Sequence, residues 1–535
     1  HTANRRQRQM CIRDRCSTVD RYADDIHYKG GCLLNENLGW GSTMWSYSSR
    51  PPDPMVVGDA WANMWTQRMK AEPFLPIKWL KHQTRDNYWK HGSVCENYDG
   101  IQSAVLAIGG WGDAYKNAVS HLVSNIKSPV KGLVGPWVHK YPHFAVPEPK
   151  IGFLQEALRW WDRWLKDIET GVEKDPKYTV HLMDGVRPQS WYAERPGVWV
   201  NEDNWPDGPN MSTFSLAKNS KLAEYHITQD LNDTVCSPQD CGLDGGEYCA
   251  IWLGPEMPGD QRRDDSYSKC YDSETLTERL DIIGSPVIQL KIKSDAKSGQ
   301  VIVRLNHIHP DGASTRITYG CLNLSHRNGH EQISDLVPNE LMDIEVILDQ
   351  IAYRVPEGHK IRVSISNCYW PLLWPMPHNS KLTLVQGTFD LPISSHGDLD
   401  ERKFQPAVVG EPWKIESLRE GGNQRGVKRD LKSGIVTTEI IDDFGKRMDK
   451  EHGLITGSIA REWWSIHPDD PLSAHGRTHW TEEIERADWS VRTETYAEMW
   501  SDYDTFYLKA SLMAFHNGDL VFEKEFNEEI QRLGH

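Results

Sequence analysis

The sequence lacks the features of a membrane-spanning or nucleic-acid-binding protein. No apolar run in its 535 residues approaches the roughly 20 needed to cross a bilayer, so no membrane partner is expected. Acidic residues outnumber basic ones by 76 to 60, which gives a formal charge of −16. A nucleic-acid partner requires a basic surface, so this composition disfavours that class and we expect no nucleic-acid partner.

Cysteine is also scarce. The chain has ten cysteines, and no two of them form a Cys-x-x-Cys pair. This density does not indicate a disulfide framework, and the spacings of Cys236, Cys241 and Cys249 do not fit the usual zinc templates. We therefore predict no cofactor and no metal. No apolar signal-peptide core follows the arginines of residues 1–15, so the localisation stays open, with the cytoplasm favoured.

Aromatic residues, in contrast, are abundant. The 23 Trp, 19 Tyr and 11 Phe are too many for a disordered chain, and the length predicts several domains. Residues 20–98 indicate irregular helices broken by prolines. A short apolar run at residues 104–108 then ends in two glycines, which is typical of a buried strand in a parallel sheet.

The pattern that follows this run is one of alternating strands and helices. Residues 114–126 have helical periodicity, residues 130–135 read as a second buried strand, and residues 153–168 form a strongly amphipathic helix pattern. Strand, helix, strand and helix in this order predict an α/β unit with a parallel sheet.

Beyond about residue 175 the pattern becomes all-β. Apolar and polar residues alternate, for example at 288–292 and 361–365, and Gly, Pro and Asp turns separate the segments. Many short strands of this kind predict a sandwich or jelly roll. Residues 396–430 are polar and predict a linker or long loop. The alternation resumes beyond them, so we expect the C-terminal region to pack on the sandwich or to extend it.

Two residues with catalytic chemistry follow the two buried strands. Asp113 comes just after the first strand and His139 just after the second. In an open parallel sheet, functional groups lie past the carboxyl ends of the strands. Asp and then His in this order match the last two members of a Ser–Asp–His triad, in which the Asp holds the imidazole that takes the serine proton. Spacing alone leaves open that Asp113 only caps a helix and that His139 only lies in a polar loop.

Several motifs make the sequence resemble the CocE/NonD family of serine hydrolases, the cocaine-esterase-like and X-Pro dipeptidyl-peptidase-like enzymes. They run in the family's order from about residue 16 to about residue 390. Besides the two loops, they are the stretch at 20–28, the double-Trp helix at 153–166, Pro-Asp-Gly-Ala-Ser at 310–314, and the segment at 355–366. The resemblance implies that Asp113 is the triad acid and His139 the base.

The residue pattern and the resemblance together predict a fold that is α/β plus all-β, in five segments. Residues 1–15 are expected to be a sequence artefact or disordered. A helical cap is expected at 16–100 and the C-terminal part of an α/β-hydrolase domain at 101–172. An X-Pro dipeptidyl-peptidase C-terminal-like jelly roll, of the galactose-binding-like type, should follow at 173–395, with a linker and a β-rich extension at 396–535.

The nucleophile that the family would supply is not found in the sequence. The resemblance places its Gly-x-Ser-x-x-Gly turn before the cap, and so before residue 16. The Gly-Ser pairs at 41–42 and 92–93 lack both the flanking glycine and a preceding buried strand. We therefore expect an N-terminally truncated chain without its serine, inactive as it stands, from an enzyme that hydrolyses a small-molecule ester, amide or peptide through an acyl-enzyme. A homodimer is left open.

Other candidate roles are weaker. Trp111 and Trp137 are candidates for substrate binding, although a Trp beside a strand end more often packs. His307 and His309 share one face of a strand, but the sequence shows no third ligand beside them, so it gives no reason to predict a metal there. The competing interpretation of the whole chain is a non-catalytic β-sandwich, for binding or interaction, that carries a relic hydrolase segment.

Overall fold

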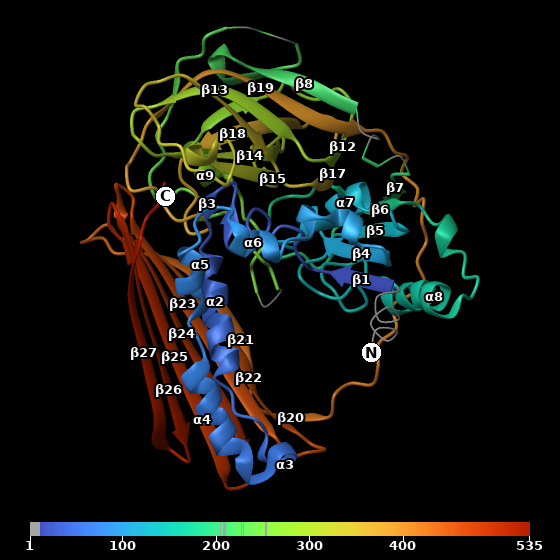
Figure 1. Cartoon of the computed structure of the whole chain (residues 1–535). Coiled ribbons are helices and arrows are strands. Elements are labelled where there is room, and N and C mark those ends of the chain that lie inside the picture. The colour runs from blue at the N-terminus through green and yellow to red at the C-terminus, as the bar shows by residue number, and fades with distance from the viewer. Residues whose placement is uncertain (1–10, 204, 207–209, 226, 228, 252–253) are drawn as a thin grey trace.

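The computed structural model of the chain describes residues 11–203, 205–206, 210–225, 227, 229–251 and 254–535. Figure 1 shows a small sheet with flanking helices, a β-sandwich above it, and a long antiparallel sheet with helices laid against it. No helix among the described residues is long and apolar enough to cross a membrane.

The predicted α/β unit is a parallel sheet of four strands, extended by one antiparallel strand. In spatial order the strands are β1 (Cys11–Arg15), β4 (Ala104–Gly110), β5 (Val130–Gly135), β6 (Tyr178–Asp184) and β7 (Gly197–Asn201). The helices α7 (Lys116–Asn125) and α8 (Phe153–Lys166) cover opposite faces. The alternation within β4 explains this, because Val105 and Ala107 pack with α7 whereas Leu106 and Ile108 pack with α8.

The structure corrects the expectation for residues 1–15. Residues 11–15 form β1, which pairs in parallel with β4 from Cys11 opposite Ala104 to Arg15 opposite Ile108. This part of the segment therefore belongs to the sheet and not to a disordered or spurious tail. The arginine-rich composition gave no sign of a strand, because this strand is stabilised by backbone pairing with β4. Residues 1–10 lie outside the described residues.

The helical cap is inserted between β1 and β4, as predicted. A small hairpin, β2 (Tyr28–Lys29) and β3 (Cys32–Leu33), precedes its helices. The helices are α2 (Glu36–Ser48), α3 (Pro54–Val57), α4 (Trp61–Ala71), α5 (Leu75–Leu80) and α6 (Asn87–His91).

The middle of the chain forms the predicted jelly-roll sandwich. Its inward-facing residues include Ile288, Leu290, Val303 and Phe389, all at most 2% exposed. Its elements are β8 (Asn210–Ala217), β9 (Lys221–Ala223), β10 (Asp233–Val235), α9 (Arg262–Ser266), β11 (Lys269–Asp272), β12 (Leu280–Gly284), β13 (Val287–Ser294), β14 (Gln300–Ile308), β15 (Ser314–Asn323), β16 (Met342–Ile347), β17 (Ile351–Val355), β18 (Lys360–Ser366) and β19 (Leu382–Ser394).

The C-terminal region is a separate antiparallel sheet of eight strands. The strands are β20 (Ile415–Arg419), β21 (Gly422–Arg429), β22 (Val436–Asp449), β23 (Ile455–His467), β24 (Asp470–Arg486), β25 (Trp489–Ser501), β26 (Thr505–His516) and β27 (Asp519–Gln531). The first two strands lie inside the stretch 396–430 that was expected to be a linker or loop, which is a correction.

This C-terminal sheet packs mainly on the cap. The Thr478 hydroxyl donates to Ser42 of α2 over 2.8 Å, and Ser46 of the same helix donates to Glu482 over 2.9 Å. Trp464 also meets Trp370, which belongs to the sandwich. One expected alternative was that this sheet extends the sandwich. Instead the sheet touches the sandwich and lies against the cap helices α2, α4 and α5 (Figure 1).

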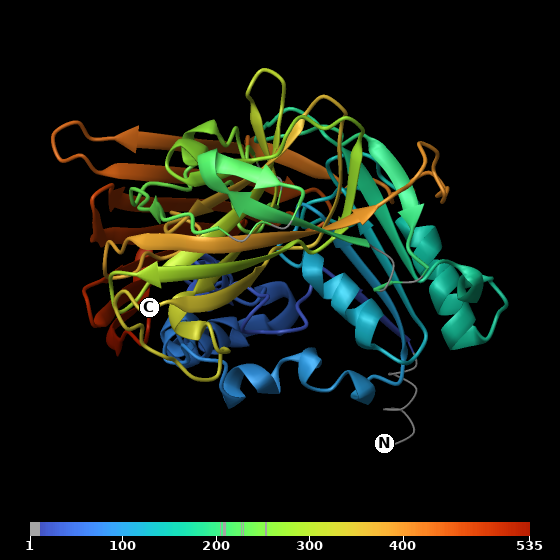
Figure 2. The same ribbon diagram turned by 90° about the horizontal axis from the view of Figure 1, so that it is seen from above.

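Helix α8 presents its apolar stripe to solvent. It buries Phe153, Ala157 and Trp160 against the parallel sheet. The stripe identified in the sequence is between 36% and 53% exposed and comprises Leu154, Leu158, Trp161, Leu165 and Ile168. Figure 2 shows this helix, in teal, on the side of the molecule opposite the red C-terminal strands. The amphipathic pattern is thus a helix with two apolar faces, of which only one is covered.

Candidate active site

The site lies where β4 and β5 end, and the backbone joins the two loops. Trp111 N–H donates to the carbonyl of Gly135, and Gly112 N–H donates to that of Trp137, both over 2.9 Å. Gly110 makes this approach feasible, because a Cβ there would lie 2.1 Å from the Trp137 carbonyl oxygen. The glycines that end the two apolar runs therefore bring the following side chains to one place.

Asp113 and His139 meet as the sequence predicts. His139 Nδ1 lies 3.1 Å from Asp113 Oδ1. The Asp113 carboxyl group is fully buried, whereas the His139 side chain is 29% exposed. The carboxylate can thus hold Nδ1–H, which leaves Nε2 as the nitrogen that a substrate or nucleophile would meet.

The environment keeps Asp113 ionised. Burial on its own would raise the pKa of Asp113, since it disfavours the charged form. The hydrogen bond and charge of His139, the nearby Cys16 thiol and the Tyr115 N–H outweigh burial and hold this pKa below its ordinary value. An ionised carboxylate at this position can stabilise an imidazolium on His139.

Cys16 is a residue of this site that the sequence pattern did not reveal. It directly follows β1 in the left-handed region, with a φ of 50°. Its sulfur, a carboxylate oxygen of Asp113 and a ring nitrogen of His139 all lie within 4.8 Å of one another. The signal that could have identified it is positional, because β1 is the neighbour of β4 and its end therefore reaches the same edge of the sheet.

Asp25 and His27, at the start of the cap, are held by local contacts. Asp25 forms an ion pair with Arg21 over 2.6 Å and accepts a hydrogen bond from Tyr115 over 3.1 Å. His27 is buried beside Arg21 and Asn37, and burial together with the Arg21 charge lowers its pKa to about 3. Asp25 therefore supports the loop of Asp113 through Tyr115.

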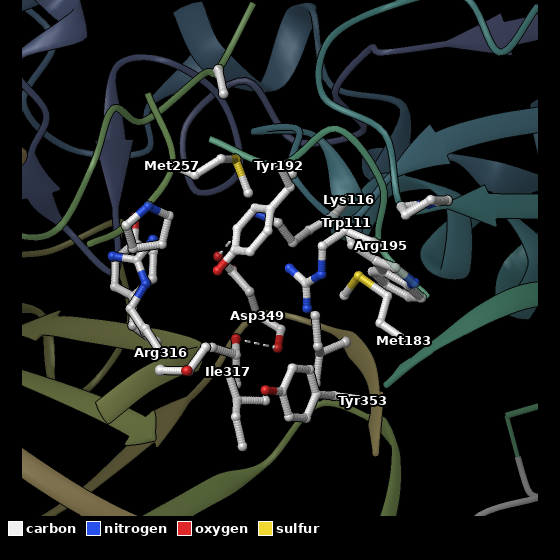
Figure 3. Close-up of a pocket in the computed structure, with 18 of the residues that line it drawn as sticks. Trp111, Lys116, Met183, Tyr192, Arg195, Met257, Arg316, Ile317, Asp349 and Tyr353 are labelled. Carbon is white, nitrogen blue, oxygen red and sulfur yellow. Dashed lines mark hydrogen bonds and ion pairs between the residues drawn. The ribbon is translucent and has the colours of Figure 1, made fainter. Parts of the chain in front are cut away.

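The two tryptophans of the loops are both buried. Trp137 is 1% exposed and donates its indole N–H to the Pro149 carbonyl over 2.8 Å, so its contacts are those of a packing residue. Trp111 is 5% exposed, donates to the His181 carbonyl over 2.9 Å, and lies at the edge of a cavity of about 80 Å³. Figure 3 shows that cavity, with Arg195 and Tyr353 among the side chains around it.

The chain matches two protein-family models. They describe the X-Pro dipeptidyl-peptidase (S15 family), over residues 2–141, and the X-Pro dipeptidyl-peptidase C-terminal non-catalytic domain, over residues 170–410. Together with the parallel sheet, the inserted cap and the jelly roll, these matches define an α/β-hydrolase-type protein.

Two curated proteins illustrate what the chain is similar to. Cocaine esterase from Rhodococcus sp. (strain MB1 Bresler) is 21% identical over 402 residues, which cover 66% of this chain and 68% of the esterase. Xaa-Pro dipeptidyl-peptidase from Lactobacillus delbrueckii subsp. bulgaricus is 20% identical over 316 residues, but the match spans only 38% of that enzyme and 51% of this chain.

A solved structure agrees in fold. The CocE/NonD family hydrolase from Staphylococcus aureus aligns with a TM-score of 0.54 and 13% identity, over 72% of this chain and 68% of that one. The family models and the curated relatives thus support a likeness to the CocE/NonD-like hydrolases, as the motifs indicated.

Proposed function

We propose that this chain carries the acid and the base of a serine acyl hydrolase, with Asp113 as the acid and His139 as the base. The observation that supports it most is the 3.1 Å contact between a buried Asp113 carboxylate and the Nδ1 of a partly exposed His139, at the ends of adjacent parallel strands. The lowered pKa of Asp113 fits this role, since the acid of a triad stays ionised while the imidazole gains and loses a proton.

In the proposed reaction His139 acts through Nε2. It takes the proton of a serine hydroxyl as the oxygen attacks the substrate carbonyl, and it returns that proton to the leaving alcohol or amine. Water then releases the acyl group by the same route. Asp113 keeps the productive tautomer and stabilises the imidazolium that forms in both steps.

The serine itself would lie outside the described residues. Among them, no serine hydroxyl is hydrogen-bonded to the His139 ring. The serines of the Gly-Ser pairs at 41–42 and 92–93 are engaged elsewhere, because Ser42 donates to the Leu38 carbonyl within α2 and Ser93 donates to the Trp89 carbonyl, each over 2.8 Å. We therefore propose that this chain alone does not turn over substrate.

The proposed substrate class is a small-molecule ester, amide or peptide. The names of the two curated relatives point to an ester in one case and to an X-Pro peptide in the other. The residues that follow Asp113 in this chain, Ala114, Tyr115 and Lys116, provide no carboxylate with which to bind a substrate amine. This favours an acyl substrate without an amino group close to the scissile bond.

The test is to read the coding DNA upstream of residue 1 and to express the longer protein that it encodes. If an in-frame Gly-x-Ser-x-x-Gly turn lies upstream, the longer protein should hydrolyse a small ester, and Asp113→Asn should cost up to about 10⁴ in turnover. His139→Ala should cost as much or more, and the two losses should not add, because the groups act as a unit. His121→Ala, an exposed histidine on α7, is the matched control and should retain full activity.

The competing function, a non-catalytic binding or interaction protein with a relic hydrolase segment, makes the opposite prediction. The longer protein would then bind no active-site probe, and Asp113→Asn would change nothing beyond stability. Full activity in the His139→Ala protein would refute the proposed mechanism, provided that circular dichroism shows the variant to be folded.

A further inference from the structure

The structure adds a third histidine to the pair that the sequence showed on one strand. His307 lies on β14 and His309 just beyond its end, and their rings stack with centroids 4.0 Å apart. His359 comes from the turn between β17 and β18, about fifty residues further along the chain. One ring nitrogen of each histidine lies within 4.8 Å of the others.

Hydrogen bonds to neighbouring hydroxyl groups orient the rings of His307 and His309. The Nδ1 of His307 is 2.9 Å from the Tyr353 hydroxyl, and the Nε2 of His309 is 3.0 Å from the Thr315 hydroxyl. These contacts engage Nδ1 of His307 and Nε2 of His309, so the other nitrogen of each ring is the candidate ligand atom. The Nε2 of His307 faces Nδ1 of His359 at 2.6 Å. Outer hydrogen-bond partners orient the ring of a metal-binding histidine.

We infer that His307, His309 and His359 form a binding site for one divalent transition-metal ion, with zinc as the expected occupant. A tetrahedral zinc with bonds of about 2.0–2.1 Å needs ligand nitrogens roughly 3.3 Å apart. The His307–His359 pair must therefore open by less than about 1 Å. The hard ions magnesium and calcium prefer oxygen ligands and are not expected here.

The surroundings suit neutral imidazole ligands. His307 is fully buried and His309 is 7% exposed. Burial, together with the neighbouring histidine rings, lowers the pKa of His307 to about 3, and burial lowers the pKa of His309 and of His359 as well. Burial disfavours the charged form of an imidazole, and the neutral form is the one that binds a metal.

Gly185 leaves room for the His307 ring. A Cβ at Gly185, which follows β6, would lie 2.7 Å from Cε1 of His307. His359 is only partly buried, so the fourth coordination position would face solvent and take water. The ion would connect the end of β14 with the β17–β18 turn, next to the sheet that carries the candidate active site.

The experiment is a zinc and cobalt titration of the full chain after treatment with a chelator. We expect one equivalent to bind with a dissociation constant below about 1 μM, and Co²⁺ to give the strong visible absorption of a tetrahedral site. His359→Ala, at the partly exposed ligand, should weaken binding at least 100-fold, and His309→Ala should do the same. Circular dichroism verifies that both variants are folded.

Two control variants test whether zinc binds at this site and not elsewhere on the chain. His139→Ala removes a ligand from the second cluster of potential ligands, Cys16, Asp113 and His139, and should leave zinc binding at the histidine site unchanged. His91→Ala, an exposed histidine of α6, should do the same. Binding weaker than about 100 μM, or binding that survives His359→Ala, would show a hydrogen-bonded histidine cluster and overturn the inference.

Discussion

Replacing Asp349 by asparagine should destabilise the whole chain, because it removes the buried counter-ion of Lys29. The side chains are 6% and 8% exposed and form an ion pair. Asn117 of α7 donates to the same carboxylate oxygen over 2.8 Å. The carboxylate thus joins the cap hairpin, the α/β unit and the sandwich. Without it, the buried ammonium group of Lys29 would lose its counter-ion.

The magnitude follows from the pKa of Asp349 and the burial of its partner. Burial would raise this pKa, but Lys29, Lys116 and Asn117 lower it from 3.8 to about 2. A lowering of the pKa by this much corresponds to roughly 2–3 kcal/mol of stability. Breaking a buried pair by removing one partner costs about 3–5 kcal/mol. Asp24 also lies near Lys29, so we expect about 3 kcal/mol, at the lower end of this range.

The pH dependence gives the sharper test. Because the folded pKa of Asp349 is depressed, its contribution is complete above pH 3.8 and is lost as the pH falls through about 2. By pH 3 the wild type should have lost about 1 kcal/mol of the stabilisation that the Asp349 carboxylate contributes. An asparagine side chain does not titrate, so the variant should show no corresponding loss. The stability difference between the two proteins should therefore narrow on acidification.

Urea unfolding followed by tryptophan fluorescence at pH 7, 5, 4 and 3 measures this difference. Asp99→Asn is the matched control, because its pair with Lys127 is 64% and 79% exposed and should contribute less than about 0.5 kcal/mol. A loss below about 1 kcal/mol in Asp349→Asn at pH 7, or a difference that does not change with pH, would refute the reasoning.

Three further predictions concern the chain as it stands. A fluorophosphonate probe should leave it unlabelled, and stoichiometric labelling of any serine would contradict the proposed absence of the nucleophile. Leu158→Glu, on the 53% exposed side chain of α8, should raise solubility without shifting the unfolding midpoint, which a solubility assay and a melting curve measure together. Trp464→Ala should cost about 3–5 kcal/mol, because this fully buried side chain packs at the junction with the sandwich, whereas the 55% exposed Trp413→Ala should cost far less on urea unfolding.

The parts of the fold that the sequence could predict are those determined by local pattern. The runs at 104–108 and 130–135 became β4 and β5, because a short apolar run between glycines has few alternatives to a buried strand. The meeting of Asp113 with His139 followed from the rule that parallel strands end at one edge of the sheet.

The parts that could not be predicted depend on partners distant in the chain. Nothing near residues 415–429 shows that this polar, Gly-rich stretch pairs with β22. The stripe of α8 has the same period as its buried face, so amphipathicity alone could not show which side is covered. Cys16 and His359 reach their clusters through strand order and a turn, neither of which leaves a local sequence signal.

The contacts of the cap bear on how a substrate would reach His139. The cap is held on one side by the sandwich, through Lys29 and Asp349, and on the other by the C-terminal sheet, through Arg50 and Glu482. An opening of the cap would have to break both of these ion pairs. The His139 side chain is already 29% exposed without any such movement. We therefore expect substrate to enter along the exposed side of the His139 ring, with the cap in place.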